Sequence, residues 1–95
     1  MLYRLFTENK NYDQIKTLVA NEFDGFTIIK TEGIWQGESE HSLIIEIECQ
    51  QKTDKKRFAI LDADGKIKSL CYAIKKLNEQ DKILVQRIEC ESKLV

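Results

Sequence analysis

The most constraining feature of this sequence is a strict alternation of side chains near its middle. Over residues 43–49 every second side chain is apolar, and two of the three positions between them are glutamates. A period of two predicts a β-strand with one buried face and one solvated face, typical of an antiparallel sheet covered on one side. Ile44 interrupts the polar parity and indicates a partner for the solvated face. The apolar positions are Leu43, Ile45, Ile47 and Cys49.

A second strand is predicted just before this one. Residues 26–31 are rich in aromatic and β-branched side chains, as strands are. We expect the polar residues 32–42 to form a loop between the two strands. This loop carries the only tryptophan, Trp35, between Gly33 and Gly37.

The N-terminal quarter predicts a strand followed by a helix. Residues 2–7 read as the strand. Asn11 is a good N-cap, and Gln14 three residues later completes a pattern that resembles a capping box. Asp24 and Gly25 are expected to end the helix, with Gly25 at a positive φ. The expected buried stripe of the helix is Tyr12, Ile15, Leu18, Val19 and Phe23.

The C-terminal half predicts a turn, a helix and a last strand. Residues 50–56 are polar and read as a turn, and residues 57–61 fit either a short extra strand or an early helical turn. Residues 62–65 are expected to form a turn and helix cap, and the last strand covers residues 83–88. The basic cluster Lys52, Lys55, Lys56 and Arg57 is interpreted as a solvated turn. Helical spacing joins Ile67, Leu70, Cys71, Ile74 and Leu77.

This order predicts one α+β domain over residues 1–95. The order βαββαβ is that of a ferredoxin-like antiparallel sheet with two helices on one face, with residues 57–61 as a possible fifth strand. The other face of such a sheet is bare. A domain of 95 residues has a thin core, so we expect copies of the chain to associate over the bare face as a homo-oligomer.

Composition excludes several classes of function. A formal net charge of −1 argues against a nucleic-acid-binding surface, and no apolar run reaches the roughly 20 residues of a membrane helix. The N-terminus lacks the pattern of a secretory signal. Cys49, Cys71 and Cys90 are widely spaced, and His41 is the only histidine, so we expect reduced thiols, no metal site, no cofactor and a cytoplasmic location.

Three stretches carry a resemblance to a known superfamily. FDGFTIIKTEG, GIWQGESEHSLIIEI at residues 33–47 and AIKKLNEQDKILVQ resemble the PII-like and CutA-like ferredoxin-fold superfamily. The resemblance covers about residues 2–90 and is greatest to small uncharacterised members with a GxWxGxxExSL turn. It implies a homotrimer whose sheets face inward, with small ligands in the clefts between subunits.

The sequence departs from the signalling members of this superfamily at two places. Their long mobile loop corresponds to the short stretch 32–42, and their glycine-rich phosphate turn corresponds to residues 78–82, which contain no glycine. Without glycines the backbone amides cannot close around phosphates in the same way. The nucleotide-binding residues of those members are therefore not transferred to this chain.

The residues around Trp35 are the candidate ligand site. An aromatic plane beside carboxylates and a histidine can stack on a ring in an intersubunit cleft. The alternative for Trp35 is an anchor against a neighbouring subunit, which is the commoner role of an interface tryptophan. The candidate ligand-binding residues are Trp35, Gly37, Glu38, Glu40 and His41.

Two functions remain open at this point. The first is a PII-like regulatory or sequestering protein that binds a small anionic ligand, such as a nucleotide, between subunits. The second is a protein-interaction module or inhibitor, of the kind found in phages and mobile elements, which acts through the Trp35 loop or a sheet edge. We predict no enzymatic activity, because His41 has no evident nucleophile to work with.

Overall fold

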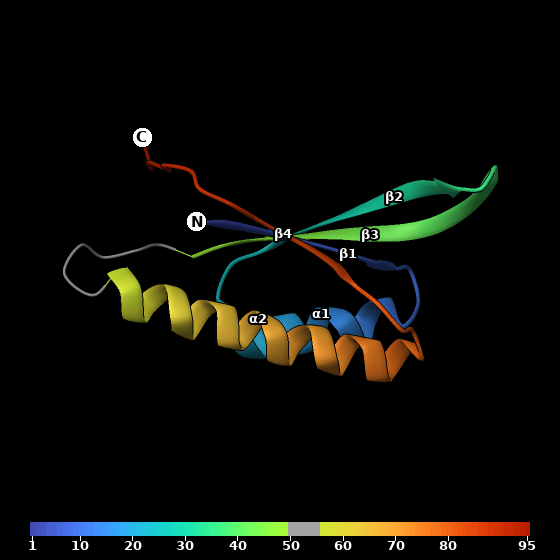
Figure 1. The fold of residues 1–95 in the computed structure, drawn as a ribbon, viewed down its shortest axis with the longest axis horizontal. Helices are drawn as coiled ribbons and strands as arrows, with labels where there is room; N and C mark the ends of the chain where they lie inside the picture. The colour runs from blue at the N-terminus through green and yellow to red at the C-terminus, as the bar shows by residue number, and fades with distance from the viewer. Residues whose placement is uncertain (50–55) are drawn as a thin grey trace.

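The structure is a computed structural model that describes the backbone of residues 1–49 and 56–95 and the side chains of residues 1–49 and 62–95. Its described elements are β1 (Leu2–Glu8), α1 (Tyr12–Glu22), β2 (Thr27–Trp35), β3 (Glu38–Glu48), α2 (Lys56–Asn78) and β4 (Leu84–Ile88). The strands form one antiparallel sheet in the order β2-β3-β1-β4, and both helices lie on the same side of it (Figure 1). The α+β class is confirmed, and the arrangement is compatible with a ferredoxin-like fold.

The core lies between the sheet and the two helices. Alternate residues of β1 and β3 point toward the helices and are buried, which is the alternation that the sequence predicts for residues 43–49. Ile15 and Val19 of α1 and Ile74 of α2 close the core from the other side and are fully buried. The buried strand residues are Tyr3, Leu5, Thr7, Leu43, Ile45 and Ile47.

The predicted loop over residues 32–42 is wrong, because β2 and β3 continue through it as a long hairpin. Trp35 pairs with Glu38, so that only Gln36 and Gly37 remain as the turn. Their φ values of 49° and 80° are both positive, as a two-residue type I′ turn requires. Gly37 adopts such a φ without strain, which makes the tight turn accessible. The hairpin extends past the end of the helix layer (Figure 1).

The extra strand at residues 57–61 and the turn at residues 62–65 are also wrong, whereas the alternative of a helical turn at residues 57–61 is confirmed. Both segments belong to α2, which begins at Lys56. Ala63 lies four residues before Ile67, on the same face of the helix, and is only 8% exposed. Burial of this face therefore outweighs the low helix propensity of Gly65. Of the predicted turn over residues 50–56, all but Lys56 lies outside the described residues.

The predicted cap at Asn11 takes a different form. Asn11 has a φ of 54°, and its side chain makes no capping hydrogen bond to α1. Its Nδ2 donates instead to the carbonyl oxygen of Leu77 at 3.2 Å and to Asn78 Oδ1 at 3.1 Å. Asn11 therefore joins the start of α1 to the end of α2. Gly25 does not adopt the predicted positive φ, because the chain already leaves α1 at Phe23 in an extended conformation.

The buried polar residues at this end of the core satisfy one another. Asn78 Nδ2 donates to Gln80 Oε1 at 2.9 Å and to Thr7 Oγ1 at 3.3 Å. Thr7 Oγ1 donates to Gln80 Oε1 at 2.7 Å. Asn78 and Thr7 are each only 3% exposed, so these bonds offset the cost of removing both side chains from water.

The chain turns sharply at the end of α2, through a residue in the left-handed region. The amide of Gln80 donates to the carbonyl of Lys75 at 3.0 Å, and Glu79 between them has a φ of 54°, the geometry of a Schellman motif. Because a left-handed conformation is costly for a side chain with a Cβ, we expect Glu79→Gly to raise the free energy of unfolding by about 1 kcal/mol. Chemical denaturation measures this change.

The matched control is Glu22→Gly at the end of α1. Glu22 lies inside the helix and has no positive φ. Glycine at that position is expected to destabilise the protein by up to about 1 kcal/mol. Equal destabilisation by both variants would contradict the description of the end of α2.

Candidate functional site

The five residues predicted as a ligand site lie on the β2–β3 hairpin, and the structure divides them between its two faces. Trp35 pairs with Glu38, and Glu40 pairs with Gly33, so the side chains of Trp35, Glu38 and Glu40 share the face that continues the uncovered side of the sheet. His41 has the opposite parity and pairs with Glu32 on the other face. Gly37 forms the turn.

The end of the hairpin is exposed on both faces. Trp35 is 70% exposed on one face, and its neighbour Ile34 is 72% exposed on the other. Glu38, Glu40 and His41 are exposed as well. Within one chain these residues therefore form a protruding surface and not a pocket, and their role in binding stays a prediction.

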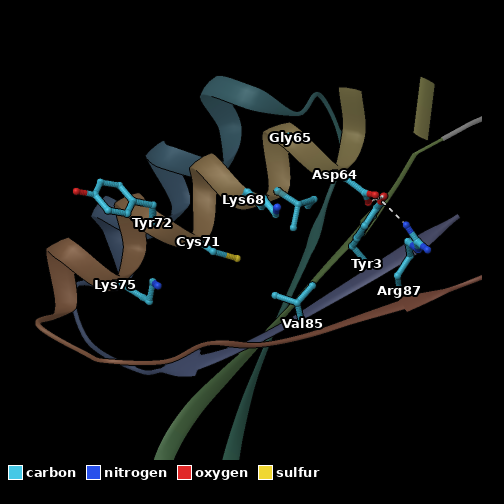
Figure 2. A pocket seen from close by; sticks show the side chains of 10 residues that line it. Tyr3, Asp64, Gly65, Lys68, Cys71, Tyr72, Lys75, Val85 and Arg87 are labelled. Atoms are coloured by element: carbon cyan, nitrogen blue, oxygen red, sulfur yellow. Dashed lines mark hydrogen bonds and ion pairs between the residues drawn. The ribbon is translucent and has the colours of Figure 1, made fainter. Parts of the chain in front are cut away.

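A cleft lies elsewhere, between α2 and β4 (Figure 2). It has a volume of about 890 Å³. One wall is a face of α2 over about three helical turns, and the other is formed by Val85 and Arg87 of β4, with Tyr3 of β1 at one end. All five residues of β4 are exposed, because α2 does not close over this edge of the sheet, and the cleft is the space left between the two. The α2 residues that line it are Asp64, Gly65, Ile67, Lys68, Cys71, Tyr72 and Lys75.

Three side chains from three elements are connected at one end of the cleft. The Tyr3 hydroxyl donates a hydrogen bond to Asp64 Oδ1, and an Arg87 guanidinium nitrogen donates to Asp64 Oδ2 at 2.8 Å. Asp64 thereby links α2 to both β1 and β4. Burial, followed by the hydrogen bond to Asp64, raises the pKa of Tyr3 well above its ordinary value. Tyr3 therefore stays protonated and acts as a donor at neutral pH.

The middle of the cleft combines cations with apolar surface. Lys68 and Lys75 line it from α2, and neither forms an ion pair within the part of the chain whose side chains are described. Cys71 lies between them, and its sulfur points toward the space above Val85 (Figure 2). Burial raises the pKa of the Cys71 thiol, and Lys75 offsets only part of this effect. The thiol is thus a neutral, apolar part of the wall.

Sequence reasoning did not find this cleft. The helical pattern marks the lysines of α2 only as residues off the apolar stripe, and the local sequence predicts Asp64 in a turn. The one sequence pattern that could have indicated the cleft is a pair of lysines, Lys68 and Lys75, seven residues apart and therefore on the same face of the helix. That spacing indicates a surface only when the position of β4 beside β1 is known, and strand order is not encoded in any local pattern.

Neither a metal site nor a membrane-spanning helix is found where the structure describes the chain. No group of three or more histidine, cysteine, aspartate or glutamate side chains is arranged to hold a metal ion in those residues. Over the same residues, no helix combines the length and the apolar character needed to cross a membrane.

The linked residues Tyr3, Asp64 and Arg87 predict a pH dependence of stability. Above the ordinary tyrosine pKa of 10.0 the unfolded chain releases the Tyr3 proton, whereas the folded chain keeps it. The unfolded state then binds fewer protons, so the free energy of unfolding falls as pH rises, by up to about 1.4 kcal/mol per pH unit for this group. The variant Tyr3→Phe is expected to lose this fall in the free energy of unfolding, which is measured by denaturation at a series of pH values from about 9 to about 11.

The control for this measurement is Tyr72→Phe. Tyr72 is 62% exposed and has no hydrogen bond to Asp64, so this variant should keep the alkaline dependence of the unaltered protein. If the pH dependence of Tyr3→Phe matched that of the unaltered protein, the raised pKa would be contradicted.

Comparison with known proteins does not place the chain in a family. The sequence matches no protein-family model and no curated protein.

Proposed function

We propose that this chain is a homo-oligomeric regulatory or sequestering protein of the PII-like kind, in which ferredoxin-like domains associate and bind a small anionic ligand such as a nucleotide. The observation that carries the proposal is an apolar row across the uncovered face of the sheet. Its residues come one from each strand, in the order Ile29, Ile44, Phe6 and Leu84, and each is the direct cross-strand partner of the next.

The row has the form of an interface between copies. Ile29 is 40% exposed and Leu84 59%, and Phe6 and Ile44 are half-buried. Polar pairs flank the apolar row on the same face of the sheet. On one side Arg4 and Glu46 form an ion pair at 2.7 Å, and on the other side Thr31 and Ser42 form a hydrogen bond. An apolar centre with polar margins is typical of a protein–protein interface.

The energy available from the row is large for so small a domain. Complete burial of one large apolar side chain stabilises a protein by roughly 1.5–3 kcal/mol, and a whole domain is typically stable by only about 5–15 kcal/mol. Covering the remaining exposed area of four such residues on every copy therefore contributes decisively to stability. We expect three copies, as the resemblance to the superfamily implies.

The assembly is tested with Leu84→Lys and Ile29→Lys, each examined by size-exclusion chromatography with light scattering. Both residues already lie partly in solvent, so each variant can fold, which circular dichroism checks. We expect the unaltered chain to elute as an oligomer and both variants as monomers, because a lysine in the apolar row must lose its hydration when a second copy covers the row.

Ile34→Lys is the matched control, because Ile34 is an exposed apolar residue on the opposite face of the hairpin. It should leave the oligomer intact. An oligomer that survived both Leu84→Lys and Ile29→Lys, or that was lost only in Ile34→Lys, would contradict association through the sheet face.

The second candidate function is a protein-interaction module, and the exposed end of the hairpin favours it. Trp35 and Ile34 present apolar side chains on its two faces, and Glu32, Glu38 and Glu40 surround them. An exposed tryptophan among charged residues is a common centre of a protein–protein contact. Such a partner would have a basic or apolar surface.

This second function predicts a protein that is captured from a cell extract by the immobilised unaltered chain and by Leu84→Lys, but not by Trp35→Ala. Mass spectrometry identifies the captured protein. The absence of any protein whose capture depends on Trp35 would count against the interaction module and leave the first function unaffected.

A further inference from the structure

We infer that the cleft between α2 and β4 is the ligand site of this protein, and that it takes an organic phosphate with an aromatic or apolar body, the chemical class to which nucleotides belong. This inference deepens the proposed function, on which it rests, and it transfers the site from the Trp35 hairpin to a different part of the molecule. The cleft lies on the helix side of the sheet, so association through the opposite sheet face leaves it open.

The size of the cleft fits such a ligand. Its volume of about 890 Å³ falls within the range of roughly 300–1,000 Å³ that small-molecule sites occupy. It is built by three elements that are distant in sequence, and the pairing of Asp64 with Tyr3 and Arg87 fixes one end of it. This end of the cleft is thus held in place before a ligand arrives.

Charge indicates the sign of the ligand. Among the lining residues whose side chains are described, Lys68, Lys75 and Arg87 are the cations and Asp64 is the one carboxylate, which gives these residues a net charge of +2, from three positive groups and one negative. The whole chain has a net charge of −1. Positive charge is therefore concentrated here against the overall balance, and a concave site focuses its field on anions.

Asp64 does not neutralise the two lysines. One of its oxygens accepts from Tyr3 and the other from Arg87, and Asp64 forms no ion pair with Lys68 or Lys75. Lys68 and Lys75 lie seven residues apart, or about 10 Å along the axis of α2. Both ammonium groups remain available to a phosphate or a short chain of phosphates.

Apolar surface in the same cleft indicates the rest of the ligand. Val85 is 40% exposed and Tyr72 is 62% exposed, whereas Ile67 and Cys71 also line the cleft but are only 3% and 9% exposed. An inorganic anion uses none of this surface. A ligand with an apolar or aromatic body covers it and gains free energy in proportion to the area removed from water.

The experiment measures binding of three probes by calorimetry: ATP, adenosine and inorganic tripolyphosphate. ATP carries both parts of the expected ligand, and the other two probes carry one part each. We expect ATP to bind at least tenfold more tightly than either of them. Lys68→Gln and Lys75→Gln should each weaken ATP binding by about tenfold, since each removes one charged hydrogen-bond donor.

Lys76→Gln is the matched control. Lys76 is adjacent to Lys75 on α2 and its replacement makes the same change in charge; its ammonium nitrogen lies 5.6 Å from the centre of the Tyr72 ring, but Lys76 itself does not line the cleft. It should leave ATP affinity within twofold of the unaltered chain. Equal losses in Lys75→Gln and Lys76→Gln would show general attraction to a basic helix and overturn the inference.

Three further results also overturn the inference. They are the absence of binding by all probes, tripolyphosphate binding as tightly as ATP, and loss of ATP binding in Trp35→Ala but not in Lys68→Gln. Light scattering on the same samples separates the inference from the proposed function. An oligomer without ATP binding rejects the cleft alone, whereas a monomer that binds ATP through Lys68 and Lys75 supports the cleft and rejects the assembly.

Discussion

Two helices on one side of a four-stranded sheet bury alternate strand residues, and this one-sided burial determines the rest of the molecule. Tyr3, Leu5 and Ile45 point toward α1 and α2 and are almost completely inaccessible to water. The residues between them must point the other way, because the side chains of a strand alternate. The core and the uncovered face are therefore consequences of the same pairing register.

Three surface features occur where the helices do not cover the sheet. The apolar row from Ile29 to Leu84 lies on the bare face. The hairpin that carries Trp35 extends beyond the helix layer (Figure 1). The cleft follows β4, whose residues are exposed at the edge of the sheet. Each feature offers contact area that the chain itself does not use and that a ligand or another protein can cover.

The sequence was sufficient to predict elements that are governed by periodicity. The alternation over residues 43–49 and the helical stripe from Ile67 to Leu77 both report which face is buried, and burial of apolar surface is the dominant stabilising force for such elements. The α+β class, with a bare sheet face, followed from their order.

Features that depend on individual backbone angles or on strand order could not be predicted. Gln36 and Glu79 have positive φ values that their residue types disfavour, so neither the tight turn of the hairpin nor the left-handed conformation that follows α2 was foreseen, although the end of α2 near Asn78 was. Asp64 and Gly65 resemble a turn locally, but the phase of a buried helix face includes them. The cleft required β4 to be placed beside β1, which only tertiary pairing decides.

Sedimentation equilibrium of the unaltered chain over a range of micromolar concentrations tests the central claim most directly. A sheet face that carries four aligned apolar residues should be closed by further copies, so a mass several times that of one chain is expected. A single species with the mass of one chain across the whole range would contradict the account.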